Sequence, residues 1–326
     1  MKFASFNSYK NTGQGKYDFF ALGLLFLTAL LPPVTPFLLF FAPAVAAYLL
    51  SKKGNLTNSL SLLIAFYFLV TLLDTFTQMR YISILLVEPV LITGVLLTAH
   101  KRKMVGPVSV MILFLLLCSL ELFLTVTIRG GDVAAAYKAV EKAMMDQFWQ
   151  GIDLYKESYG KEFPAQISEA INQMAETLKT YLPSMLLGYI FSISFLNTLF
   201  FQKLLLKSGA LSQEMSFENW RMPEQMVWLF ILSGFMALVP WEPYSLIGRN
   251  AVVVVSFFYL VQGFAIIKFF FKIMDTPLII RGLIYIVIGI QWFGLLLVVL
   301  TGLFDNWFDF RARLQRSRLL KENSED

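Results

Sequence analysis

Long apolar runs separated by short charged segments dominate the pattern of this 326-residue chain. The runs are apolar on every side, so we place their ends by length, by proline and glycine breakers and by flanking charge. Because about twenty apolar residues in a helix cross a hydrocarbon core about 30 Å thick, the pattern predicts membrane-spanning helices. The predicted spans cover residues 18–31, 37–50, 56–73, 81–99, 105–126, 181–201, 225–240, 251–271 and 277–304.

The segment 128–180 has a different pattern, in which apolar residues recur every three or four positions on a charged background. They are Tyr137, Val140, Met144, Phe148, Ile152, Tyr155 and Tyr159, followed after Pro164 by Ile167, Ile171, Met174 and Leu178. This spacing is typical of amphipathic helices. Eight acidic and six basic residues give the segment a net charge of −2, which is unfavourable for anionic lipid. The segment is therefore predicted to be a helical hairpin outside the membrane.

The predicted fold class is all-α, a polytopic helical membrane protein with eight or nine transmembrane helices and an extramembrane amphipathic helical hairpin. Five N-terminal spans (1–126), an extracytoplasmic insert (127–180), C-terminal membrane helices (181–304) and a basic polar tail (305–326) follow one another. Lysines of the short loops place those loops in the cytoplasm. A ninth span would carry the basic tail outward against this rule, so both counts stay open. The first two runs are short, and one long kinked element is the alternative there.

The composition supports a membrane protein and argues against several classes of function. The chain is 57% hydrophobic and only 15% charged, and its net charge of +5 comes from short loops, so no nucleic-acid partner is expected. One cysteine and one histidine exclude a disulfide framework and a Cys or His metal site. No nucleophile constellation or phosphate-binding glycine loop occurs. We therefore expect no enzyme activity, no cofactor and no bound metal.

Carboxylates inside the predicted spans are candidates for binding a solute, because charge within a membrane is costly. Asp74, Glu88 and Glu121 are predicted to lie in the outer half of the bilayer. Candidate partners on the span 251–271 and just before it are Arg249, Asn250 and Gln262. These groups could line an outward-opening pocket for a polar or cationic solute. Alternatively, a carboxylate pairs with the arginine or is neutral through a raised pKa.

Two aromatic and charged motifs lie at the predicted cytoplasmic rim. "WRMPEQMVW" precedes the span 225–240, where tryptophan suits the headgroup layer and proline suits a first helical turn. "GLFDNWFDFR" ends the last apolar run. The candidate residues for partner docking or interfacial contact are Trp220, Arg221, Pro223, Asp305, Trp307, Asp309 and Arg311.

These motifs carry a resemblance to a known family. "FENWRMPEQMVW", "NAVVVVSFFYLVQGFAIIKFF" and "LTGLFDNWFDFRAR" resemble the YybS-like family of bacterial inner-membrane proteins, whose biochemical role is not established. The first six predicted spans are distantly similar to the substrate-binding subunits of energy-coupling-factor vitamin transporters. That similarity implies a solute pocket that opens outward, although the alanine docking motif of those subunits is absent from residues 19–31.

Two functional hypotheses follow from the sequence. The first is a solute-binding or transport subunit without its own ATPase, in the bacterial inner membrane with several passes. The alternative is a membrane scaffold or interaction protein for envelope or morphogenesis factors. The expected partners are the lipid bilayer, a membrane or cytoplasmic protein, and a small polar or cationic solute.

Overall fold

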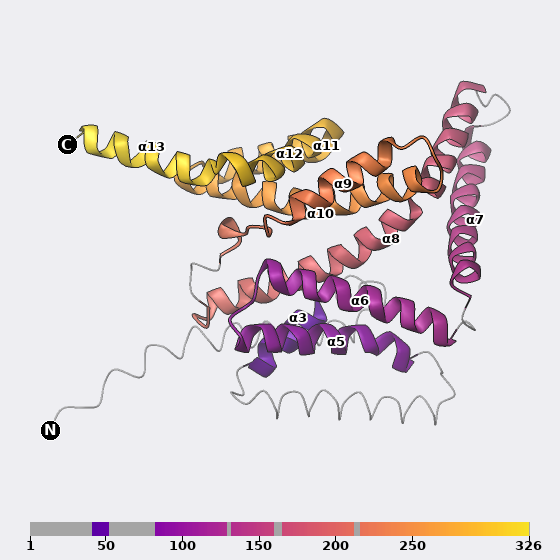
Figure 1. The fold of residues 1–326 in the computed structure, drawn as a ribbon, viewed down its shortest axis with the longest axis horizontal. Coiled ribbons are helices and arrows are strands. Elements are labelled where there is room, and N and C mark those ends of the chain that lie inside the picture. The colour runs from indigo at the N-terminus through magenta and orange to yellow at the C-terminus, as the bar shows by residue number, and fades with distance from the viewer. Residues whose placement is uncertain (1–40, 52–81, 129–131, 160–164, 212–215, 326) are drawn as a thin grey trace. The chain divides into compact units, whose positions relative to one another are not determined.

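The computed structural model describes residues 41–51, 82–128, 132–159, 165–211 and 216–325 (Figure 1). Within these residues the chain forms ten α-helices and a short 3₁₀ turn, and no strand, so the all-helical prediction is confirmed for them. The helices are α3 (Ala42–Ser51), α5 (Ile82–Lys101), α6 (Pro107–Ile128), α7 (Val133–Tyr159), α8 (Ala165–Lys207), α9 (Met226–Leu238), α10 (Tyr244–Ile273), α11 (Leu278–Ile290), α12 (Trp292–Phe308) and α13 (Phe310–Glu325), with the turn η2 at Phe217–Asn219.

The predicted number of eight or nine transmembrane helices is wrong for the described residues. Two helical stretches there are long and apolar enough to cross a membrane, Ile167–Lys207 and Tyr244–Ile273. A third span results if Leu278–Ile290 and Phe293–Phe308, which are bent by 106° at their junction, count as one. The predicted runs 18–31 and 56–73 lie outside the described residues.

The lower number of spans follows from the length of the apolar helical stretches. The other apolar helical stretches among the described residues have 10–17 residues. They are the helices Ala42–Ser51 and Met226–Leu238, the stretch Pro89–Lys101 within α5 and the stretch Pro107–Phe123 within α6. At about 1.5 Å per residue, a stretch of this length extends at most about 25 Å. A hydrocarbon core is about 30 Å thick. Counting apolar runs therefore gave more spans than the apolar helical stretches of the described residues support.

The described chain divides into two compact units, each built from separate stretches. Unit 1 holds the described residues of Met1–Leu115, Phe191–Met222 and Val261–Asp326, and unit 2 holds Leu116–Ile190 and Pro223–Leu260. All the residues of the candidate site below belong to unit 1.

Buried polar side chains join the first helices of unit 1. The Asn197 side chain on α8 accepts a hydrogen bond from the backbone N–H of Ala44 at 3.2 Å. The Thr93 hydroxyl on α5 donates to the carbonyl oxygen of Pro43 at 3.3 Å. Polar contacts of this kind hold helices together where apolar burial alone does not distinguish protein from lipid. They fix α3 against α5 and α8.

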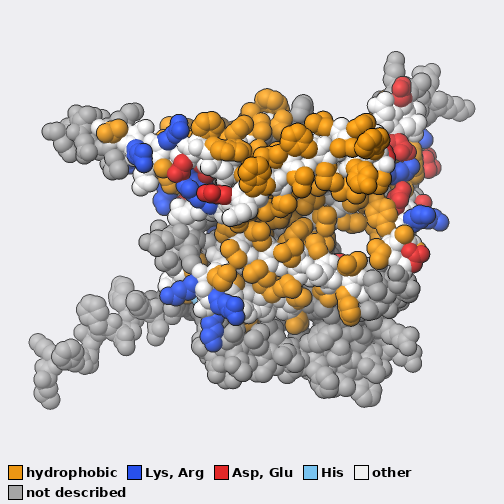
Figure 2. All heavy atoms as spheres, in the orientation of Figure 1, with side chains coloured by type: hydrophobic (Ala, Val, Ile, Leu, Met, Phe, Trp, Pro, Cys, Tyr) orange, Lys and Arg blue, Asp and Glu red, His pale blue; other side chains and the backbone are white. Residues whose placement is uncertain are grey.

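The C-terminal helices of unit 1 carry an exposed apolar surface. Figure 2 shows hydrophobic side chains gathered over α11 and α12, and every described side chain of α11 is at least partly exposed. The most exposed large apolar residues of α11 are Leu278, Ile279, Val287 and Ile290. A surface of this kind is unfavourable in water and favourable in lipid. It agrees with a protein that contacts the membrane.

Unit 2 has its own tight packing between α9 and α10 and between α8 and α10. At Gly248, a Cβ atom would overlap the backbone of Met236 and Ala237, so the two helices approach more closely than a larger residue allows. Asn250 is buried and accepts a hydrogen bond from the backbone N–H of Ser184 at 3.0 Å. Its amide also donates to the carbonyl of Thr180 at 2.9 Å. The close contact at Gly248 therefore determines how α9 packs on α10, and the hydrogen bonds of Asn250 determine how α8 packs on α10.

Candidate functional site

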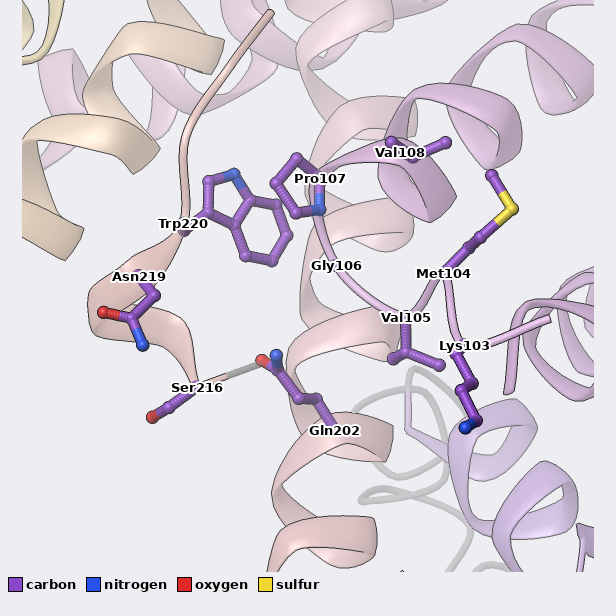
Figure 3. Close-up of a pocket in the computed structure, with 10 residues that line it drawn as sticks. All are labelled: Lys103, Met104, Val105, Gly106, Pro107, Val108, Gln202, Ser216, Asn219 and Trp220. Carbon is purple, nitrogen blue, oxygen red and sulfur yellow. The ribbon is translucent and has the colours of Figure 1, made fainter. Parts of the chain in front are cut away.

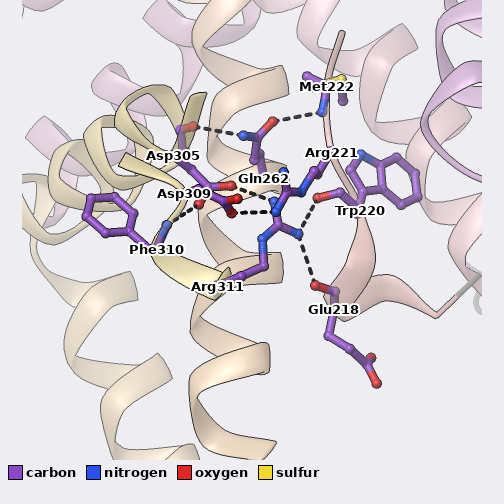
Figure 4. Close-up of polar contacts among 10 residues, drawn as sticks. Glu218, Trp220, Arg221, Met222, Gln262, Asp305, Asp309, Phe310 and Arg311 are labelled. Atoms are coloured by element: carbon purple, nitrogen blue, oxygen red, sulfur yellow. Dashed lines mark hydrogen bonds and ion pairs between the residues drawn. The ribbon is translucent and has the colours of Figure 1, made fainter. Parts of the chain in front are cut away.

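The best-defined site in unit 1 is a cluster of polar groups that joins two segments far apart in the sequence. We call it the polar cluster. Its members are Glu218, Trp220, Arg221, Met222, Gln262, Asp305, Asp309, Phe310 and Arg311 (Figure 4).

One side of the polar cluster is the segment 216–222. The 3₁₀ turn Phe217–Asn219 turns the chain, and Trp220 follows in an extended conformation with φ −64° and ψ 123°. The Trp220 ring packs edge-on against Phe195 of α8 and against Phe217, with centroid distances of 5.6 and 5.8 Å. Contacts between aromatic rings in this geometry add to the stabilisation from burial. They hold the backbone of the segment against α8.

The other side is the corner between α12 and α13. Helix α12 ends at Phe308 and is capped by Asp309. The left-handed backbone of Asp309 (φ 41°) is a conformation that Asp and Asn tolerate better than most residues. The backbone N–H of Asp309 donates to the carbonyl of Asp305 at 3.0 Å. The N–H of Phe310 donates to the Asp305 carboxylate at 3.0 Å. Asp305 thereby satisfies two backbone donors at the corner.

Arg311 connects the corner to the segment 216–222. Its guanidinium is buried and forms an ion pair with the equally buried Asp305, with an Nη2 to Oδ2 distance of 2.6 Å. Nη1 donates to the backbone carbonyls of Glu218 and Trp220 at 3.1 and 3.0 Å (Figure 4). Planar guanidinium groups with several fixed donors suit such multiple contacts. The start of α13 is therefore pinned to the backbone of the segment.

Two further side chains, of Arg221 and Gln262, complete the polar cluster. Arg221 pairs with Asp309 at 2.6 Å, and both side chains are about half exposed, 52% and 47%. Gln262 of α10 is buried and accepts a hydrogen bond from the backbone N–H of Met222 at 2.8 Å. Its amide nitrogen donates to the carbonyl of Gly302 at 3.0 Å. Gln262 of α10 thus connects the segment 216–222 to α12 through these two hydrogen bonds.

Glu218 adds an electrostatic link to α10. Lys268 and Lys272 of α10 each lie 2.9 Å from one of its carboxylate oxygens. Burial by itself would raise the pKa of Glu218. Hydrogen bonds from Ser216, Lys272 and Lys268 outweigh burial and lower this pKa from 4.5 to about 2. The carboxylate is therefore charged across the physiological pH range.

This lowered pKa predicts a loss of stability in acid. Because the folded pKa lies below the unfolded one, the charged carboxylate stabilises the fold above about pH 4.5, and this contribution disappears as the pH falls toward about 2. It amounts to at most about 3 kcal/mol. We expect the thermal midpoint of the detergent-solubilised protein to fall in this window more steeply than that of Glu218→Gln. Parallel curves for the two proteins would contradict the assignment.

The structure brings together most of the residues predicted to dock a partner. Trp220, Arg221, Asp305, Asp309 and Arg311 all belong to the polar cluster. Trp307 is exposed and contacts the ring of Phe304, and Pro223 is half-buried just after the segment, at the first residue of a unit 2 stretch. Arg311 was expected on a polar tail, and it is instead one of the few buried charges of the described chain.

The described candidate solute-binding residues each make contacts of their own. Gln262 belongs to the polar cluster and Asn250 bridges α8 and α10. Arg249 pairs with Glu242 on the preceding loop. The Glu121 side chain is exposed, whereas Asp74 and the side chain of Glu88 lie outside what the structure describes.

Sequence reasoning missed the roles of Glu218, Lys268 and Lys272. The two lysines stand four residues apart, on one face near the end of an apolar helix. Such a pair needs a nearby anion or solvent. The spacing indicates the lysine face, but the matching carboxylate lies about fifty residues earlier and only the fold brings it there.

Apolar helices of spanning length and an aromatic, charged cluster at the helix ends define a helical membrane protein. Comparison with known families agrees. The sequence model of the family described as predicted membrane protein (DUF2232) matches residues 19–306, so the chain belongs to this family. Neither the curated proteins nor the solved structures contain a match to the chain.

Proposed function

We propose that the protein is a membrane-embedded interaction protein that holds α13 as a docking edge for an acidic surface of a cytoplasmic protein. One observation carries this proposal. The buried Arg311 binds both Asp305 and the backbone of residues 218–220, so the start of α13 is held in place. A helix fixed in this way presents its side chains with little loss of conformational entropy on binding.

The exposed side chains of α13 are positively charged, so they favour a partner with an acidic surface. Arg313 and Arg316 are exposed, and Arg313 also lies over the Phe308 ring at 5.6 Å. Arg318 is held by Asp275 at 3.6 Å and by the carbonyl of Ile273 at 2.7 Å. Helix α13 therefore combines fixed and solvent-facing arginines. Complementary charge speeds association and selects against basic partners.

The proposed location is the bacterial inner membrane, with several passes and with α13 on the cytoplasmic side. Lysines of the short loops support this orientation through the positive-inside rule. The resemblance of the "WRMP" and "DNWFDFR" motifs to YybS-like inner-membrane proteins supports it as well. Envelope or morphogenesis factors are the class of partner we propose.

A second proposal is the solute-binding or transport subunit, to which the similarity to energy-coupling-factor subunits also points. The break at Gln291 between α11 and α12 favours it, since the helices there bend by 106°. Discontinuous helices of transporters expose backbone groups that bind ions and solutes. The predicted carboxylates Asp74, Glu88 and Glu121 do not contribute to this argument.

The test is affinity purification of the full chain from native membranes, with quantitative mass spectrometry of proteins and small molecules. Arg313→Gln together with Arg316→Gln removes two exposed charges from α13 and spares the polar cluster. The matched control is Lys138→Gln with Lys142→Gln, two exposed charges of α7. We expect a salt-sensitive acidic partner that the α13 variant loses and the control retains.

Equal recovery of that partner with both variants would contradict docking on α13. A bound small molecule that both variants retain, without any such partner, would favour the transport proposal instead.

A further inference from the structure

Helices α11 and α12 are apolar, but each is too short to cross a membrane. Helix α11 has 13 residues and α12 has 17. At about 1.5 Å per residue they extend about 20 Å and about 25 Å, less than the hydrocarbon core of about 30 Å. The chain bends by 106° between them. One broken span would keep its direction across the break, whereas a bend beyond a right angle turns α12 back toward the side from which α11 came.

The contacts of α11 show that it runs back along α10. Arg281, near the start of α11, donates to the carbonyl of Thr276 at 2.7 Å and to that of Phe271 at 3.4 Å. One turn further on, the Tyr285 ring packs against Phe271 and Phe264, with centroid distances of 5.5 and 6.0 Å. Later positions of α11 therefore contact earlier positions of α10, so the two helices run in opposite directions (Figure 1).

Helices α12 and α13 return to the end of α10. The side chain of Gln262 on α10 first contacts α12, through its hydrogen bond to the carbonyl of Gly302 at 3.0 Å. Arg318 of α13 then donates to the carbonyl of Ile273, the last residue of α10, at 2.7 Å. It also pairs with Asp275 at 3.6 Å. A segment that leaves one end of a helix and returns to the same end begins and ends on the same side of the membrane.

The charges of this segment lie only near its two ends. Residues 282–304 include no charged side chain. Arg281, the one charged residue of α11, points to the carbonyls at the end of α10. The apolar part between is strongly exposed, with Leu278 at 83% and Ile290 at 77%. Exposed apolar surface between charged ends suits the hydrocarbon of a membrane better than water.

The break between α11 and α12 is compact. The carbonyl of Gln291 accepts hydrogen bonds from the N–H groups of Gly294 and Leu295 at 2.9 and 3.3 Å. At Gly294, a Cβ atom would lie 2.9 Å from the carbonyl oxygen of Ile288, so the first turn of α12 packs closely on the end of α11. Backbone groups at membrane depth need partners within the protein. The Gln291 carbonyl has such partners at the tip of the segment.

The apolar surface of α11 is separate from the pocket that the structure describes in unit 1. That pocket has a volume of about 210 Å³ and is lined by the loop that joins α5 to α6, by α8 and by the segment 216–222 (Figure 3). None of its lining residues belongs to α11 or α12. The surface of α11 is therefore the outside of a helix rather than the wall of this pocket, and it fits acyl chains better than a small enclosed ligand.

We infer that α11 and α12 form a re-entrant hairpin, in which the exposed surface of α11 contacts the acyl chains of a single leaflet and α13 stays on the side where α10 ends. The length agrees with this depth. Helix α11 extends about 20 Å, which reaches past one leaflet of about 15 Å of hydrocarbon but not through the second. The lipid contact of α11 does not depend on any protein bound to α13.

The test is cysteine labelling of the full chain in sealed membranes of known orientation, with a membrane-impermeant maleimide added to one side at a time. The single-cysteine variants are Met274→Cys, Ser317→Cys and Val287→Cys, each combined with Cys118→Ala. Met274 follows α10 and is 66% exposed, and Ser317 is exposed on α13. Val287 is 60% exposed on the apolar surface of α11.

The control for sidedness is Trp241→Cys, at an exposed position just before α10, because α10 is long enough to cross the membrane. We expect Met274→Cys and Ser317→Cys to be labelled from the same side, and Trp241→Cys from the opposite side. Val287→Cys should react from neither side until the membrane is dissolved in sodium dodecyl sulfate.

Labelling of Met274→Cys and Ser317→Cys from opposite sides would overturn the hairpin in favour of one broken span. Labelling of Val287→Cys in sealed membranes, from either side, would overturn the contact of α11 with acyl chains.

Discussion

Arg311→Met is expected to destabilise the protein by about 3–5 kcal/mol, the cost of removing one partner from a buried ion pair. The substitution keeps most of the side-chain volume but leaves Asp305, which is only 1% exposed, as a buried carboxylate without its cation. The carbonyls of Glu218 and Trp220 also lose their donor. The measurement is thermal or denaturant unfolding of the purified protein in detergent.

Arg221→Met is the matched control for this prediction. Arg221 pairs with Asp309 between the same two segments, but both side chains are about half exposed. Exposed ion pairs contribute about 0–1 kcal/mol, so this variant should unfold nearly like the parent. If the two variants lost the same stability, burial would not be what gives the Arg311 pair its effect.

Gly263→Ala is expected to be the second strongly destabilising change. Gly263 lies on α10 against α12, and a Cβ atom there would overlap the backbone carbonyl oxygen of Val298. A backbone atom cannot move aside as a flexible side chain can, so the two helices must separate. Overpacking of this kind costs about 1–3 kcal/mol and sometimes more. Separation would also strain the bridge from Gln262 to Gly302.

The control is Gly282→Ala on α11, where an added Cβ atom would meet nothing within 4 Å. Alanine favours a helix over glycine by up to about 1 kcal/mol. Gly282→Ala should therefore leave the unfolding midpoint unchanged or raise it, while Gly263→Ala lowers it. A midpoint for Gly263→Ala at or above that of the parent would refute the close contact of α10 with α12.

The sequence predicted the helical class and marked both motifs of the polar cluster, but it did not predict that they meet. Tryptophan, arginine and aspartate near helix ends are visible as local patterns. Arg311 and Trp220, however, are 91 positions apart, and no local pattern pairs them. A single arginine in a basic tail resembles a solvated charge. Its burial depends on the corner at Asp309 and on two backbone carbonyls that only the fold supplies.

The number of spans could not be read from apolar length alone. The run 277–304 contains a polar residue near its middle, Gln291, at which the chain leaves the helical conformation with φ −106° and ψ 120°. Glutamine is a good helix former, so the sequence does not indicate a helix break at Gln291. Arg249 illustrates the opposite case, because its partner Glu242 is close in sequence and a local ion pair there was available to sequence reasoning.

A cross-link between the segment 216–222 and the start of α13 would test directly whether the two segments meet in the polar cluster. Arg221→Cys and Asp309→Cys are introduced together with Cys118→Ala, which removes the single native cysteine. Both positions are about half exposed and accessible to a short bismaleimide. We expect mass spectrometry of the digested protein to find the two cysteine peptides joined within one chain. Reagent attached separately to each cysteine, without the joined peptide, would contradict it.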